Sequence, residues 1–167
     1  GTVLRKVDVS GTGGVGIEIF AGGEDNRVLD SKVRNNVKGI EAYSTEGTVV
    51  RNTEVSGNDE TGIQIGWSSG WAVTGSKIHH NGGNGVLTDT ADEGAVSGNE
   101  IRSNGENGVA EAGNGNTGVV TVSGNRIESN VRSGVALQIG AVGGLVVGNR
   151  VKLNGRYAVE VSDHPYG

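Results

Sequence analysis

Two tryptophans and a tyrosine, Trp67, Trp71 and Tyr43, are the side chains whose chemical use is most evident in this sequence. An exposed aromatic ring offers a flat apolar surface together with one polar atom, which suits stacking against the C–H face of a sugar ring. Amide and carboxylate groups near the rings would hydrogen-bond the sugar hydroxyls. Together these groups predict a carbohydrate-binding surface. The residues expected to supply the polar groups are Glu41, Gln64, Asp89 and Gln138.

A Gly-Ile motif that returns at a nearly fixed interval must position these residues. From one copy to the next, its leading aliphatic residue advances by 23, 23, 23, 23, 26 and 24 residues. A period of this size is typical of a solenoid, in which each repeat is one coil stacked on the next. The copies are Gly16-Ile17-Glu18-Ile19, Gly39-Ile40-Glu41-Ala42, Gly62-Ile63-Gln64-Ile65, Gly85-Val86-Leu87-Thr88, Gly108-Val109-Ala110-Glu111, Gly134-Val135-Ala136-Leu137 and Ala158-Val159-Glu160-Val161.

Each repeat contains three short apolar segments separated by turns rich in Gly, Asn and Ser. Apolar and polar residues alternate within the segments, as they do in β-strands, and no helical stripe persists. The sequence therefore predicts an all-β fold: a right-handed parallel β-helix of about seven coils, with three short parallel sheets and no substantial helix.

Two turn residues have predicted roles in that fold. The glycine of each motif is expected to let the chain turn sharply into the next strand. An asparagine that recurs once per coil is expected to hydrogen-bond its neighbours along the stack. These asparagines are Asn36, Asn58, Asn81, Asn104, Asn130 and Asn154.

The composition excludes several classes of protein. The 167 residues include 32 glycines without a three-residue period, one proline and six aromatics, and the net charge is −5. These values argue against collagen and against a partner held by phosphate neutralisation, such as nucleic acid. No apolar run approaches the roughly 18 residues of a membrane span, and without cysteine there is no disulfide framework. We expect residues 1–167 to be a single module excised from a longer multidomain protein, since the chain starts inside a repeat.

Strand alternation places two columns of side chains on the outside of the Gly-Ile sheet. We expect Trp67, Trp71 and Tyr43 to lie on or beside this face, although either tryptophan could instead fill a corner of its coil and Tyr43 could simply stack on Phe20. The first column is Glu18, Glu41, Gln64, Leu87, Ala110, Ala136 and Glu160, and the second is Phe20, Tyr43, Gly66, Asp89, Ala112, Gln138 and Ser162.

No cofactor is expected, but a calcium ion between Glu18 and Glu41 is an alternative. The two carboxylates would lie about 4.8 Å apart on neighbouring coils, and a cation between them would relieve their repulsion.

Three weaker arrangements could serve catalysis. Asp89 and Glu111 could form a carboxylate pair, and Asp163-His164-Pro165-Tyr166 contains residue types used by uronan epimerases. His79-His80 could bind a metal, but we expect both histidines to be solvated residues of the asparagine turn.

Repeats such as Ser123-Gly124-Asn125-Arg126-Ile127-Glu128-Ser129-Asn130 before Gly134-Val135, and Gly98-Asn99-Glu100-Ile101-Arg102-Ser103-Asn104 before Gly108-Val109, resemble the parallel β-helix repeat family over nearly the whole chain. Within that family, the chain is similar to the β-helical carbohydrate-binding modules attached to plant-polysaccharide hydrolases. That resemblance implies a secreted, non-catalytic protein that binds xylan and is tethered to a catalytic domain.

The expected function is therefore binding of an extended cell-wall polysaccharide, xylan or a related hemicellulose, without catalysis. Two alternatives stay open: a fragment of a polysaccharide lyase, hydrolase or uronan C5-epimerase, and a structural segment of a spike or adhesin. The expected partner is a polysaccharide, with neither nucleic acid nor a membrane involved.

Overall fold

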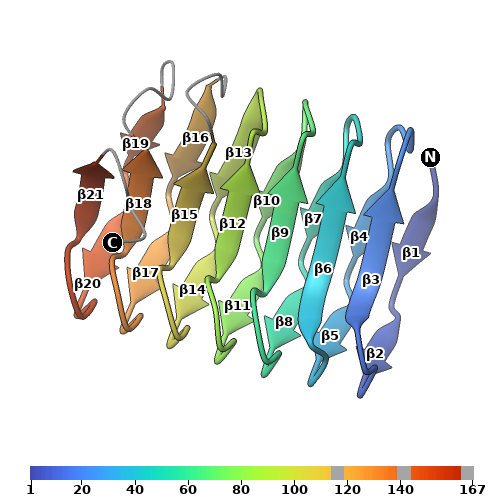
Figure 1. The fold of residues 1–167 in the computed structure, drawn as a ribbon, viewed down its shortest axis with the longest axis horizontal. Helices are drawn as coiled ribbons and strands as arrows, with labels where there is room; N and C mark the ends of the chain where they lie inside the picture. The colour runs from blue at the N-terminus through green and yellow to red at the C-terminus, as the bar shows by residue number, and fades with distance from the viewer. Residues whose placement is uncertain (114–118, 139–143, 163–167) are drawn as a thin grey trace.

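The computed structural model describes residues 1–113, 119–138 and 144–162 and confirms the predicted fold. Within these residues, twenty-one short strands form three seven-stranded sheets, and every strand pair is parallel. Each coil contributes one strand to each sheet, so the coils stack side by side into a parallel β-helix (Figure 1). The described residues contain no helix, and none that could cross a membrane.

The three sheets are named A, B and C in the order in which the chain enters them. Sheet A contains β1 (Val3–Arg5), β4 (Arg27–Leu29), β7 (Val49–Arg51), β10 (Ala72–Thr74), β13 (Gly94–Ser97), β16 (Val120–Ser123) and β19 (Leu145–Val147). Sheet B contains β2 (Asp8–Ser10), β5 (Lys32–Arg34), β8 (Glu54–Ser56), β11 (Lys77–His79), β14 (Glu100–Arg102), β17 (Arg126–Glu128) and β20 (Arg150–Lys152). Sheet C contains β3 (Val15–Phe20), β6 (Lys38–Tyr43), β9 (Ile63–Gly66), β12 (Val86–Asp89), β15 (Val109–Ala112), β18 (Val135–Gln138) and β21 (Val159–Ser162).

Aliphatic ladders fill the interior because equivalent residues of successive coils are in register. Ile40 pairs with Ile63, and Ile63 pairs with Val86, in sheet C. All three side chains are fully buried. One or two branched side chains per strand therefore suffice for a continuous core, which explains how a chain with so few aromatic residues forms a core.

The predicted asparagine ladder lies in the turn between sheets B and C. The side-chain amide of Asn104 donates to Oδ1 of Asn130 at 2.9 Å, and Oδ1 of Asn104 accepts from the amide of Asn81 at 3.0 Å and from its backbone N–H at 3.2 Å. A second ladder lies between sheets A and B and is not evident from the sequence, because its members change type along the stack. They are Ser31, Thr53, Ser76, Asn99, Asn125 and Asn149.

The glycine of the Gly-Ile motif has a different role from the one predicted. Gly62 does not have a positive φ. A Cβ atom there would lie 2.7 Å from Nδ2 of Asn81 and 2.8 Å from the backbone oxygen of Gly85. Glycine is therefore required because the next coil packs directly against its Cα atom. The sharp turns with positive φ lie at other positions.

Replacing Asn104 with Ala tests the asparagine ladder. The substitution leaves the buried amide groups of Asn81 without their acceptor, so the free energy of unfolding should fall by about 2–4 kcal/mol. Asn154→Ala is the matched control, because the partly buried end of the ladder is accessible to water, and it should cost about 1 kcal/mol. Urea unfolding measures both, and equal losses would contradict a role that depends on burial.

Candidate functional site

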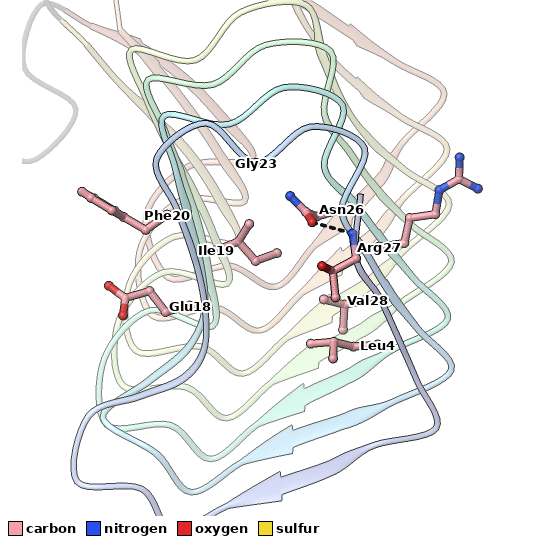
Figure 2. A pocket seen from close by; sticks show the side chains of 9 residues that line it. Leu4, Glu18, Ile19, Phe20, Gly23, Asn26, Arg27 and Val28 are labelled. Atoms are coloured by element: carbon pink, nitrogen blue, oxygen red, sulfur yellow. Dashed lines mark hydrogen bonds between the residues drawn. The ribbon is translucent and has the colours of Figure 1, made fainter.

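The outer face of sheet C carries both predicted columns in register. Glu18 pairs with Glu41 and Phe20 pairs with Tyr43 between β3 and β6, and the next coil continues the columns with Gln64 and Gly66. Figure 2 shows the alternation in the first coil: Glu18 and Phe20 point outward, and Ile19 between them points into the coil. In later coils the first column passes through two buried alanines, Ala110 and Ala136, so the exposed polar and aromatic groups concentrate in the first four coils.

The cavity drawn in Figure 2 belongs to the end of the core. It has a volume of about 250 Å³ and is lined on its inner side by Leu4, Ile19 and Val28. Asn26 closes it by accepting a hydrogen bond from the backbone N–H of Thr2 at 2.8 Å. Glu18 and Phe20, which face outward from sheet C, also line this cavity, whereas Tyr43, Gln64 and Trp67 do not.

Two aromatic rings form a stack on sheet C. The ring centroids of Phe20 and Tyr43 are 5.9 Å apart, with an angle of 13° between the ring planes. The Tyr43 ring leans over Gly66 on the following coil, where a Cβ atom would lie 2.7 Å from its Cδ2 atom. Glycine at position 66 thus leaves room for the ring to lie against the sheet. The alternative that Tyr43 stacks on Phe20 is therefore confirmed. The outer partner, Phe20, is still 64% exposed.

Trp67 extends this aromatic surface to a third coil. It follows Gly66 directly, has a left-handed backbone with φ of 49°, and is 57% exposed. The same corner is left-handed in the neighbouring coils, at Ala21, Ser44 and Thr90. A left-handed backbone is costly for a large side chain. The corner of the coil therefore fixes the conformation of Trp67, and its indole ring stays accessible.

A shallow groove of about 300 Å³ lies beside Trp67. Its floor consists of the loops that connect sheet C to sheet A, which keep a parallel register through bridges from Glu24 to Glu46 and from Glu46 to Ser69. Glu46 was not among the predicted binding residues, although the near-equal loop lengths place it one coil after Glu24. The lining residues are Gly22, Gly23, Glu24, Ser44, Thr45, Glu46, Trp67 and Ser69.

The prediction that Trp71 stacks on a sugar is wrong. Its side chain is only 2% exposed and belongs to the core. The indole packs over Gly94 of the next coil, where any side chain would collide with it. Trp71 therefore fills a corner of the β-helix, which was the structural alternative for this residue.

The predicted polar groups are distributed unevenly. Gln64 and Asp89 are half-buried on successive coils, and Oδ1 of Asp89 accepts a hydrogen bond from Oγ1 of Thr90 at 3.1 Å. Glu41 is held by an ion pair with Lys38 at 2.8 Å. The side chain of Gln138 lies outside the described residues. The structure thus brings Tyr43, Gln64 and Trp67 together and adds Asp89 one coil further along.

Glu41, one of the two residues of the alternative calcium site, already has a cationic partner. The ammonium group of Lys38 already supplies a positive charge to Oε1 of Glu41 at 2.8 Å. Within the described ranges, no group of three or more Asp, Glu or His side chains could hold a metal ion.

The proposed carboxylate pair of Asp89 and Glu111 is also wrong. Glu111 pairs with Thr88 and points into the core, where it is 1% exposed, whereas Asp89 pairs with Ala112 and faces outward. The segment 163–166 lies outside the described residues.

The chain belongs to the family described as "Right handed beta helix region", whose model matches residues 15–166. This match confirms the right-handed parallel β-helix. No curated protein sequence matches the chain.

Solved structures share the fold at low sequence identity. A mutant of the periplasmic alginate epimerase AlgG has a TM-score of 0.79 at 17% identity, over 89% of this chain and 39% of its own. The A-module of the mannuronan C-5 epimerase AlgE4 from Azotobacter vinelandii gives 0.72 at 15% identity, over 95% and 55%. Pectate lyase Pel9A gives 0.69 at 14% identity, over 92% and 50%. This chain therefore spans about two fifths to just over half the length of these proteins.

The contrasting positions of the two tryptophans predict contrasting effects on stability. Trp71→Ala should lower the free energy of unfolding by about 3–5 kcal/mol, because it opens a cavity in the core. Trp67→Ala should change it by no more than about 0.5 kcal/mol. Urea unfolding measures both variants. Acrylamide should quench the fluorescence of the Trp71→Phe variant strongly and that of the Trp67→Phe variant weakly, and the reverse order would contradict the assignment.

Proposed function

We propose that this chain is a non-catalytic module that binds an extended polysaccharide of the xylan or hemicellulose type along the outer face of sheet C. The observation that carries the proposal is the exposed Trp67 beside the Phe20–Tyr43 stack, on three consecutive coils. A contiguous exposed apolar patch marks a binding surface more often than a singly exposed apolar residue does.

The polar groups around the aromatic surface fit hydroxyl-bearing rings. Gln64 donates and accepts hydrogen bonds, while Asp89, Glu24 and Glu46 accept them. On the flat sheet and in the shallow groove beside Trp67, a bound chain of sugars can continue past the site in both directions, as an extended polymer requires. The net charge of −5 favours a neutral polysaccharide over a polyuronate. A secreted protein in which this module is tethered to a catalytic domain is part of the proposal.

A second candidate function is part of a polysaccharide lyase or epimerase. The observation that favours it is that solved structures with this fold include alginate epimerases and a pectate lyase. Each proposal predicts a different outcome when the chain is incubated with alginate or polygalacturonate. An enzyme would produce unsaturated uronate absorbance or change the uronate composition, and a binding module would leave the polymer unchanged.

Trp67→Ala tests the binding proposal. Affinity electrophoresis through gels containing neutral xylan should show retardation of the unaltered protein. The variant should bind about tenfold more weakly, because a central aromatic contact commonly contributes 1.4 kcal/mol or more.

Leu153→Ala provides the matched control, since it also removes an exposed apolar side chain, at 83% exposure, but from the turn between sheets B and C. Its mobility in the gel should equal that of the unaltered protein. The proposal fails if no neutral xylan or hemicellulose retards the protein, or if the two variants are retarded equally.

A further inference from the structure

The outer face of sheet B differs from that of sheet C in carrying dense, alternating charge. Lys77 lies between Glu54 and Glu100 in one column, and Arg102 lies between His79 and Glu128 in the other. Opposite charges on neighbouring strands stabilise a sheet. His79 and the adjacent His80 interrupt this pattern.

The two histidines lie edge to face, and their Nδ1 atoms are 2.8 Å apart. The expectation that both are solvated turn residues is wrong for His79, which ends strand β11 and is half-buried. Its other ring nitrogen, Nε2, lies 3.5 Å from Oε1 of Glu54 on the neighbouring strand. His80 is exposed at a left-handed position with φ of 56°.

One pair of tautomers satisfies both contacts. With a proton on Nε2 of His79 facing the Glu54 carboxylate, the Nδ1 lone pair of His79 can accept. His80 then donates its Nδ1 proton across the 2.8 Å contact. A metal ion that binds both Nδ1 atoms must displace that proton.

The separation of the two nitrogens selects among metal ions. At a metal–nitrogen distance of about 2.0 Å, two ligands at a right angle are about 2.8 Å apart, whereas tetrahedral ligands are about 3.3 Å apart. The observed 2.8 Å therefore matches two adjacent positions of a tetragonal ion. The contact from Nε2 of His79 to Glu54 is the carboxylate support that a metal-bound histidine commonly has.

The charges around His79 and His80 allow a divalent cation to bind there. The nearest cationic side chain, Arg102, is engaged by Glu100 at 3.1 Å, and Glu54 supplies negative charge on the other side.

We propose that His79 and His80 form a surface site for one divalent ion of the copper(II) or nickel(II) type. Nδ1 of both residues are the protein ligands, Glu54 orients His79, and water completes the coordination. Imidazole pairs with tetragonal geometry favour copper(II), which also forms the strongest complexes of the first-row divalent ions. This site lies on sheet B and does not depend on the polysaccharide site of sheet C.

Titration of copper(II) chloride into the chain at pH 7.5, followed by calorimetry and electron paramagnetic resonance, tests the site. We expect one tightly bound ion per chain with two imidazole nitrogens in its spectrum, and weaker binding of zinc(II). His80→Asn should weaken copper binding at least tenfold, while asparagine tolerates the left-handed backbone. Glu54→Gln should weaken it about tenfold by removing the support for His79.

The third histidine of the chain provides a matched control, because His164→Gln removes an imidazole and leaves the residues at positions 79 and 80 unchanged. Its affinity for copper(II) should equal that of the unaltered protein. A double variant, His79→Gln with His80→Asn, separates the site from other copper ligands of the chain, and its unfolding in urea reports whether it folds. The proposal is overturned if the double variant, or the folded His80→Asn protein, binds copper(II) as tightly as the unaltered chain.

Discussion

The register between coils is the constraint on which the rest of the structure depends. Every strand pairs in parallel with its equivalent one coil away, and the buried side-chain ladders repeat the same offset. The hydrogen bonds of one coil are completed by the next coil. The contacts of a residue therefore depend more on its neighbours along the axis of the β-helix than on its neighbours along the chain. Asn104 illustrates this dependence, since it serves Asn81 and Asn130, each more than twenty residues away in sequence.

The same register gives the β-helix faces of different chemistry. On sheet C it aligns Phe20 with Tyr43 and leaves Trp67 exposed at the next corner, so apolar rings lie beside amide and carboxylate groups. On sheet B it alternates basic and acidic side chains from strand to strand, as in the column that includes Lys77 and Glu100. Because only the inward positions must repeat, the outward positions can differ from sheet to sheet. Separate binding sites can therefore form on different sheets.

The period and alternation were sufficient to predict the fold and the outward columns of sheet C in the first four coils, because these follow from the chain's own spacing, but not the burial of Ala110 and Ala136 further along the first column. The position of Trp71 could not be predicted in this way. Its burial depends on the space left by Gly94, one coil away. It also depends on a corner of the coil, where strand alternation no longer determines whether a side chain points inward or outward. The ion pair of Glu41 with Lys38 and the contact between His79 and His80 likewise depend on side-chain directions that spacing leaves open.

The two indole N–H signals of the protein report whether a polysaccharide binds at the exposed aromatic rings of sheet C. In a nitrogen–proton correlation spectrum, addition of a soluble xylo-oligosaccharide should shift the indole resonance of Trp67 together with backbone amides of sheet C. The indole resonance of the buried Trp71 should stay near its original position. If the oligosaccharide shifts neither indole, or shifts only amides of sheet B, the polysaccharide does not bind where the exposed rings lie.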